Sequence, residues 1–249
     1  MIIAFSDADV SEYIKIILSH MTNNTILIDK YMQGTELEVD AICDGKDVLL
    51  PGIMEHIDRA GIHSGDSIAV YPAWNLTEEQ TEKIIDYSTK LALALQTKGL
   101  INIQYVISDG EIYVIEVNPR SSRTVPYLSK VTGVPMIDIA TRIMLGETLE
   151  NMGYASGLYP NANHVAVKVP VFSFEKLAGL DTSLGPEMKS TGEVLGIAPT
   201  LNEALYKGLL GAGYHFESKG GVLITVRDTD KEEVIQIAKD FSALGFHLY

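Results

Sequence analysis

The alternation of apolar and polar positions is clearest between residues 101 and 120. Two apolar runs rich in β-branched residues, 101–107 and 112–117, flank the sequence Ser108-Asp109-Gly110. A run, a short turn and a second run predict a β-hairpin. The positions of the polar residues within the two runs then decide how the strands pair.

A turn centred on its glycine places Asn102 opposite Asn118 and Gln104 opposite Glu116. All four side chains then share one face, because side chains alternate between the two faces of a strand. A turn one residue shorter would pair Gln104 with Ile115 and mix polar with apolar residues on both faces. The alternation therefore favours the first register.

This register predicts an oxygen-rich patch on the hairpin. Directly opposed residues lie about 5 Å apart at Cβ. Gln104, Glu116 and Asn118 could therefore share one hard cation such as Mg²⁺. A solvated sheet face explains the same pattern, and the hairpin alone does not decide between the two.

Periodicity and capping signals predict the remaining elements. A strand pair that directly follows a helix favours an α+β arrangement over a serial parallel sheet. We expect strands at 1–5, 25–31, 36–42, 48–57, 164–171 and 222–226, with another beginning at 245. We expect helices at 7–20, from Thr77 to before Gly99, at 134–145, at 200–210 and at 229–244.

Three carboxylates alternate with apolar residues in the strand at 36–42. Glu36, Glu38 and Asp40 line one face, which is either solvated or able to accept hydrogen bonds from a ribose. Downstream, Gly61 and Gly65 bracket a histidine and a serine. This glycine-rich composition lets backbone N–H groups approach an anion, although a structural loop explains it equally.

Two arginines follow the hairpin in the polar turn Asn118-Pro-Arg-Ser-Ser-Arg123. Arg120 and Arg123 either balance the nearby carboxylates or hold an anionic substrate or a moving phosphoryl group. The planar guanidinium suits phosphate oxygens.

Composition narrows the class of protein. A net charge of −14 over 249 residues disfavours nonspecific binding to nucleic acid or anionic membranes. No apolar run is long enough for a membrane span. The single cysteine, Cys43, excludes an internal disulfide, indicates a cytoplasmic protein and is expected to be a buried small hydrophobe.

Four motifs, in this order, resemble the large chain of carbamoyl phosphate synthetase. The resemblance runs essentially end to end and identifies the second ATP-grasp half, whose ATP phosphorylates carbamate. The motifs are Glu36-Leu-Glu-Val-Asp-Ala-Ile-Cys-Asp-Gly45, Gly61-Ile-His-Ser-Gly-Asp-Ser67, Ile115-Glu-Val-Asn-Pro-Arg120 and Leu184-Gly-Pro-Glu-Met-Lys-Ser-Thr-Gly-Glu193.

The resemblance implies a partial ATP-grasp fold, the C-terminal lobe with an antiparallel sheet and helices, followed by the start of an α/β domain. Residues 1–149 would be the ATP-grasp portion with its first lobe incomplete. Residues 150–213 would complete the carbamoyl-phosphate synthetic unit. Residues 214–249 would begin a truncated allosteric domain similar to methylglyoxal synthase.

The resemblance also implies roles for individual residues, with ATP and Mg²⁺ or Mn²⁺ as cofactors. Catalytic arginines would face the substrate, nucleotide-binding residues would surround ATP, and three side chains would ligate the metal. The catalytic residues are Arg120 and Arg123; the nucleotide-binding residues are Lys30, Met32, Glu36, Gly61, Ile62, His63, Ser64, Gln104 and Glu116; the metal ligands are Gln104, Glu116 and Asn118.

The resemblance implies carbamate as substrate, a glutaminase small chain as partner and an oligomer. The resemblance also implies an upstream lobe that covers the phosphates, which we expect this chain to lack, so we expect a fragment with little or no synthetase activity of its own. Two alternatives remain: another ATP-grasp carboxylate–amine ligase, and a noncatalytic scaffold or assembly fragment.

Overall fold

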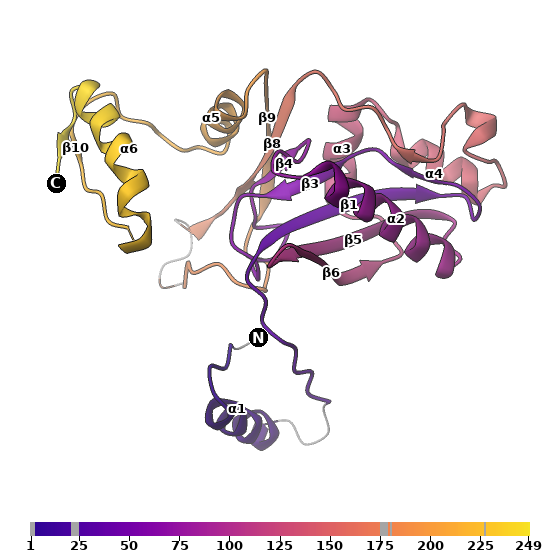
Figure 1. Cartoon of the computed structure of the whole chain (residues 1–249), viewed down its shortest axis with the longest axis horizontal. Coiled ribbons are helices and arrows are strands. Elements are labelled where there is room, and N and C mark those ends of the chain that lie inside the picture. Colours follow the sequence, from indigo (N-terminus) through magenta and orange to yellow (C-terminus); the bar gives the residue numbers. More distant parts are fainter. Residues whose placement is uncertain (1–2, 21–24, 175–178, 180, 227) are drawn as a thin grey trace. The chain divides into compact units, whose positions relative to one another are not determined.

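The computed structural model describes residues 3–20, 25–174, 179, 181–226 and 228–249. The chain forms two compact units, Met1–Ala212 and Gly213–Tyr249. Figure 1 shows the elements of both units.

In the described part of the first unit, nine strands form one sheet. The order is β6-β5-β1-β3-β4-β8-β9; β2 pairs with β1 and β7, and only the β2–β7 pairing is parallel. The strands are β1 (Thr35–Cys43), β2 (Val48–Leu50), β3 (Ile53–His56), β4 (Ala69–Tyr71), β5 (Gly99–Ser108), β6 (Glu111–Asn118), β7 (Gly157–Leu158), β8 (Val165–Val171) and β9 (Gly192–Ala198).

Helix α2 (Glu78–Ala94) begins at the predicted capping box. Thr77 Oγ1 accepts a hydrogen bond from the Gln80 N–H, and Gln80 Oε1 accepts one from the Thr77 N–H, so two otherwise unpaired donors are satisfied. The other helices of the unit are α1 (Asp7–His20), α3 (Thr124–Thr132), α4 (Met136–Met144), the 3-10 turn η1 (Glu150–Met152) and α5 (Leu201–Gly211).

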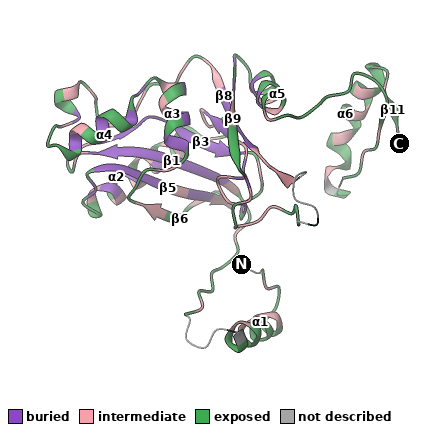
Figure 2. Cartoon of the chain, turned by 180° about the vertical axis from the view of Figure 1, so that it is seen from behind, coloured by how far each residue is buried: buried purple, intermediate pink, exposed green. Residues whose placement is uncertain are grey.

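The two faces of β1 differ in what covers them. Leu37, Val39 and Ala41 point to one face, where they form an apolar core with residues of α2 and β5. On the opposite face, Ile42 packs with residues of α3 and α4, and this second core occupies only one end of the strand. Figure 2 shows that the central strands are nevertheless buried along most of their length. The other end of this face is left for polar side chains.

The hairpin of β5 and β6 has a register that changes along its length. A tight turn joins the strands: Asp109 has φ 52° and Gly110 has φ 82°, and near it Ser108 pairs with Glu111. This is the shorter turn that the alternation disfavoured. A bulge at Ile115 then restores the predicted pairs farther from the turn, Asn102 with Asn118 and Gln104 with Glu116.

The antiparallel sheet with helices confirms the predicted α+β class, and most predicted elements are present. Two strands are wrong: residues 3–5 and 25–31 have no strand, and residues 1–2 lie outside the described part of the chain. Several described elements of this unit were not predicted: helix α3, the strands β4, β7 and β9, and the 3-10 turn η1. The predicted run at 48–57 is divided at Pro51-Gly52 into β2 and β3, which both pair with β1.

The second unit is a small β-α-β arrangement. Strands β10 (Gly221–Val222) and β11 (His247–Leu248) are parallel, and α6 (Lys231–Ala243) connects them after the 3-10 turn η3 (Asp228–Asp230). The predicted strand at 222–226 is thus shorter and begins one residue earlier. The strand expected after residue 245 is confirmed. The predicted capping by the Thr229 side chain lies outside what the structure describes.

Candidate functional site

Three acidic side chains of β1 form the floor of the candidate site. Glu36, Glu38 and Asp40 are 7%, 2% and 1% exposed, so the solvated alternative is wrong for this face. They share the face with Asn102 and Gln104, because Asp40 lies opposite Asn102 and Glu38 opposite Gln104 on β5. Buried carboxylates require partners, and each of the three has a different set.

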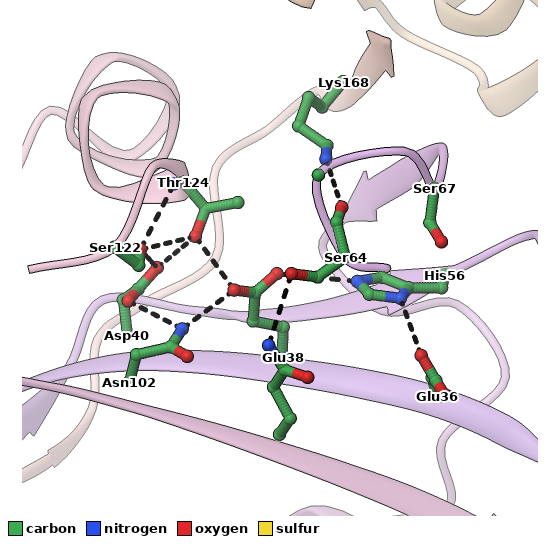
Figure 3. A network of polar contacts seen from close by, with 12 residues as sticks. Glu36, Glu38, Asp40, His56, Ser64, Ser67, Asn102, Ser122, Thr124 and Lys168 are labelled. Carbon is green, nitrogen blue, oxygen red and sulfur yellow. Dashed lines mark hydrogen bonds and ion pairs between the residues drawn. The ribbon is translucent and has the colours of Figure 1, made fainter. Parts of the chain in front are cut away.

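His56, from β3, lies between two of the carboxylates (Figure 3). Its Nδ1 is 3.4 Å from Glu36 Oε2 and its Nε2 is 3.5 Å from Glu38 Oε2. Both distances are long for hydrogen bonds, and neither ring nitrogen has a hydrogen-bond partner. Burial acts to lower the pKa of His56, but the two carboxylates raise it above its usual value.

Glu38 is stabilised in its ionised form. Burial acts to raise its pKa, but His56, Lys168 and a hydrogen bond from Asn102 lower it below the usual value. Its Oε2 atom is buried and has no hydrogen-bond partner. Glu38 therefore carries a charge into the sheet interior, where neighbouring cations, the Asn102 amide and the Thr124 hydroxyl compensate it.

The pKa of Asp40 is shifted in the opposite direction from that of Glu38. Burial, and after it the charge of Glu38, raise the pKa of Asp40 to about 7. Its Oδ1 accepts a hydrogen bond from Asn102 Nδ2 (3.0 Å), its Oδ2 accepts one from Ser122 Oγ (2.8 Å), and Thr124 Oγ1 makes a short contact with the same oxygen. Asp40 thus connects the floor of the sheet to the loop before α3.

Lys168, from β8, supplies a buried cation. It is 1% exposed, and its Nζ donates to the carbonyl oxygen of Ser64 at 2.7 Å. Burial lowers its pKa below the usual value, and the charges of Glu38 and Glu193 act against this. Lys168 links the central carboxylates to the glycine-rich loop.

The glycine-rich loop, residues 59–67, is fixed from three sides. Glu36 Oε1 accepts a hydrogen bond from the Gly61 N–H at 2.8 Å, and the His63 N–H donates to the Gly185 carbonyl at 2.8 Å. Asp66 accepts from the N–H groups of Lys189 and Ser190 at 2.7 and 2.8 Å. The segment 184–193 therefore packs against this loop.

These elements enclose a cavity of about 260 Å³ on the polar face. Its lining combines acidic, amide, hydroxyl and cationic groups, which suits a polar anionic ligand better than an apolar one. The lining residues are Glu38, His63, Ser64, Gly65, Asn102, Gln104, Glu116, Arg120, Ser121, Ser122, Arg123, Thr124, Lys168 and Glu193.

Two of the predicted metal ligands, Gln104 and Glu116, line this cavity, and the third, Asn118, contacts Glu116 but does not line it. Gln104 Nε2 donates to Ser64 Oγ (3.2 Å), and Asn118 Nδ2 donates to Glu116 Oε1 (2.9 Å). These contacts use the amide nitrogens, and amide and carboxylate oxygens are the donors that Mg²⁺ prefers. The described residues contain no group of three or more His, Cys, Asp or Glu arranged for a metal, so any cation here depends on the two amides.

The predicted catalytic and adenine residues differ in their placement. Arg120 and Arg123 line the cavity from the loop before α3, and both are exposed. Lys30 is exposed and Met32 half-buried in the irregular segment before β1. The neighbouring Tyr31 reaches the glycine-rich loop, where its hydroxyl donates to the Ala60 carbonyl at 3.3 Å.

A second cavity of about 450 Å³ lies beyond the arginine loop. Arg120 and Ser121 line both cavities, so this loop separates them. The floor of the second cavity is mainly apolar, and three side chains around it are half or more exposed. These are Leu95 (51%), Ile137 (52%) and Met144 (66%).

Sequence reasoning missed several members of the site. His56, Lys168, Ser122 and Thr124 were assigned no role, because each is a single polar residue within or beside an apolar element. The available signal was the row of three carboxylates, Glu36, Glu38 and Asp40, that alternates with apolar residues in β1. Such buried charges require cations from neighbouring strands.

Comparison with families of known proteins gives a match that covers more than half of the chain. The family described as "Carbamoyl-phosphate synthase L chain, ATP binding domain" matches residues 1–152. This range contains β1, the glycine-rich loop, the β5–β6 hairpin and the arginine loop.

Curated relatives match over almost the whole chain. The carbamoyl phosphate synthase large chain of Agathobacter rectalis is 56% identical over 249 residues, which are 100% of this chain and 23% of that protein. That of Clostridium perfringens is 54% identical over 248 residues, 99% of this chain and 23% of that protein. The chain thus spans about a quarter of the length of these relatives.

Solved structures share the fold at low identity. The biotin carboxylase domain of a single-chain bacterial carboxylase gives a TM-score of 0.53 at 18% identity, covering 69% of this chain and 44% of that one. Rhizobium etli pyruvate carboxylase gives 0.54 at 19% identity, covering 72% and 21%. Among the described residues, no helix has the length and apolar character needed to cross a membrane.

Proposed function

The chain belongs to the carbamoyl phosphate synthase large-chain family, and from this premise we propose that it forms one wall of a site that binds ATP with Mg²⁺ or Mn²⁺ and phosphorylates carbamate to carbamoyl phosphate. The intact protein would be an ATP-dependent ligase of arginine and pyrimidine biosynthesis. The observation that carries the proposal is one cavity whose lining combines Gln104 and Glu116 with the cationic side chains of Arg120, Arg123 and Lys168.

In this proposal Gln104, Glu116 and Asn118 hold the metal ion through their oxygen atoms. The metal neutralises charge on the phosphates when bound. The exposed guanidinium groups of Arg120 and Arg123 orient the anionic substrate or the transferring phosphoryl group, since phosphoryl transfer depends on positioning and charge neutralisation. Lys168 and Ser64 hold the glycine-rich loop beside the reacting groups.

The nucleotide would be held along the edge of this wall. Lys30 and Met32 would contact the adenine and Glu36 the ribose, while Gly61, Ile62, His63 and Ser64 would line the nucleotide. Glu36 already accepts the Gly61 N–H at 2.8 Å, which supports a further role in fixing this loop.

We also propose that the chain divides into three parts. Residues 1–149 would be the ATP-grasp portion, 150–213 the end of the synthetic unit and 214–249 the beginning of an allosteric domain similar to methylglyoxal synthase. The separate compact unit of 213–249, with its parallel β10 and β11, supports the last assignment. A glutaminase small chain, carbamate, an oligomeric assembly and a cytoplasmic location would follow for the whole protein.

Isothermal titration calorimetry with Mg-ATP tests the site. We expect the wild-type chain to bind and Glu116→Ala to lose binding. Glu111→Ala is the matched control, because Glu111 lies on the same strand but opposite Ser108, beside the turn, and does not line the cavity. Equal binding by wild type and Glu116→Ala would contradict the metal role of Glu116.

A second candidate function is a noncatalytic assembly role. The exposed apolar side chains around the second cavity, Leu95, Ile137 and Met144, favour it. Absence of Mg-ATP binding by the wild-type chain, together with self-association in analytical ultracentrifugation that Met144→Glu abolishes, would support this function instead.

A further inference from the structure

Asp40 occupies a position under the loop that carries both arginines. Ser122 lies between them, directly before Arg123, and Thr124 directly follows Arg123. Through its Oδ2, Asp40 contacts the hydroxyl groups of both Ser122 and Thr124. The arginine side chains are exposed, whereas Asp40 is 1% exposed. The loop is therefore attached to the sheet by a buried carboxyl group.

The hydrogen atoms available to this network can be counted. Six close contacts join Asp40, Glu38, Asn102, Ser122 and Thr124. With both carboxylates ionised, only four hydrogens are available: two on the Asn102 amide and one on each hydroxyl. Two contacts would then join oxygens without a hydrogen between them.

A fifth hydrogen on Asp40 changes this arrangement. The Asp40 carboxylic acid donates to Thr124 Oγ1, which frees the Thr124 hydroxyl to donate to Glu38 Oε1 at 3.2 Å. Ser122 still donates to Asp40 Oδ2. When Asp40 is protonated, five of the six contacts contain a hydrogen. Glu38 then has no second negative charge beside it.

The charged groups around Asp40 favour one negative charge on the pair Glu38 and Asp40, carried by Glu38. Glu38 lies two residues away on the same face of β1, and its charge is compensated by His56 of β3 and Lys168 of β8. The pKa of Asp40 is raised to about 7 by burial and by Glu38. The arginines lie on the exposed side of the loop, and Glu116 lies on β6 across the cavity.

We propose that Asp40 is a positioning residue, a carboxylic acid that donates to Thr124 and so holds the loop of Arg120 and Arg123 in place, and that its ionisation loosens this loop. The benefit of this loop for phosphoryl transfer rests on the proposed function. The dependence of the loop on Asp40 does not, so the two can fail separately.

Limited trypsin digestion measures how loosely this loop is held, because trypsin cleaves after Arg120 and Arg123. Fragments ending at these residues are quantified by mass spectrometry between pH 6.5 and 8.5. Cleavage after Lys219, an exposed residue of the second unit that precedes β10, corrects for the pH dependence of trypsin itself. The full chain is used, as wild type and as Asp40→Asn, Asp40→Ala and Ser122→Ala.

We expect relative cleavage of the wild-type loop to rise several-fold as the pH increases through this range. Asp40→Asn should stay slow at every pH, because its amide can donate to Thr124 as the carboxylic acid does. Asp40→Ala should be cleaved fast at every pH. Ser122→Ala loses one contact with Asp40 but keeps the contact between Asp40 and Thr124, so its cleavage should still rise with pH, and this variant serves if Asp40→Ala fails to fold. Circular dichroism checks the folding of each variant.

Two outcomes would overturn the proposal: cleavage of Asp40→Asn as fast as that of Asp40→Ala at pH 6.5, or a wild-type loop whose cleavage does not change with pH. A merely space-filling role would not give a wild-type loop whose cleavage rises with pH beside an isosteric Asp40→Asn loop whose cleavage does not. Calorimetry with Mg-ATP is separate, because failure to bind would contradict the proposed function and leave the digestion result unaffected.

Discussion

Gln104 lies directly opposite Glu116 although the turn that joins their strands would by itself pair Gln104 with Ile115. The bulge at Ile115 reverses the side-chain alternation of β6 beyond that residue. Val117 is thereby turned toward the α2 core, while Glu116 faces the cavity. One extra residue in the strand therefore decides whether the hairpin presents a carboxylate or an apolar side chain to the site.

The turn of this hairpin requires glycine at its second position. Gly110 has φ 82°, a conformation that costs other residues about 1 kcal/mol or more. We expect Gly110→Ala to lower the free energy of unfolding by roughly that amount, measured by urea denaturation. Gly185→Ala is the control, since no atom lies within 4 Å of the added Cβ and Gly185 does not have a positive φ. Equal effects of both substitutions would contradict this account.

Gly196 permits the close approach of β9 and α5. A Cβ at Gly196 would lie 2.0 Å from the Ala204 carbonyl oxygen and 2.6 Å from the Gly208 nitrogen, both of which are backbone atoms. Gly196→Ala should therefore destabilise the chain by about 3 kcal/mol, at the upper end for overpacking. Gly192→Ala, in the same strand, should have little effect, because its nearest neighbour is Val171 Cβ at 3.9 Å. A thermal melt that shows no difference between them would refute this packing argument.

A buried hydrogen bond joins α2 to the sheet. The hydroxyl groups of Ser88 and Tyr105 are 2.8 Å apart, and both side chains are fully buried. Tyr105→Phe leaves the Ser88 hydroxyl without this partner and should cost about 1–2 kcal/mol. The double variant with Ser88→Ala should recover part of that loss. Strict additivity in the double-mutant cycle would show that the two groups are not coupled.

The protonation of His56 should contribute to the pH dependence of the free energy of unfolding. Its pKa is raised in the folded chain by Glu36 and Glu38, so its contribution to stability is complete below the unfolded pKa of about 6.5. The contribution is lost as the pH rises through the folded value. We expect His56→Gln to remove this part of the decline in urea denaturation between pH 6 and 8. His247→Gln, in the second unit, should retain it; an unchanged decline in His56→Gln would exclude His56 as its source.

The sequence predicted elements whose signals are local. The capping box at Thr77 located the start of α2, and alternation located β1 and the hairpin. Helix α3 was missed because Pro126 and a preceding polar turn are typical of loops. In the structure Pro126 lies in the first turn, where its missing N–H has no cost. The buried residues Val125, Leu128 and Val131 carried the helical spacing.

The candidate site was predictable only where one strand pair determines it. Gln104 and Glu116 were brought together by their register, which is a local property. Lys168 and His56 reach the same cluster from β8 and β3, and no spacing in the sequence indicates that β4 lies between those strands. The protonation state of Asp40 depends on this tertiary packing, since burial is the largest cause of its raised pKa.

Strand β1 presents an apolar face to α2 and an acidic face to the cavity. Selection for heat resistance and selection for chemistry therefore act on opposite sides of one strand. Buried carboxylates such as Glu38 and Asp40 can often be replaced by apolar residues with a gain in stability. If related chains no longer bound a ligand in this cavity, their acidic residues on this face would accordingly be replaced first. Leu37, Val39 and Ala41 would remain, because they form the apolar core.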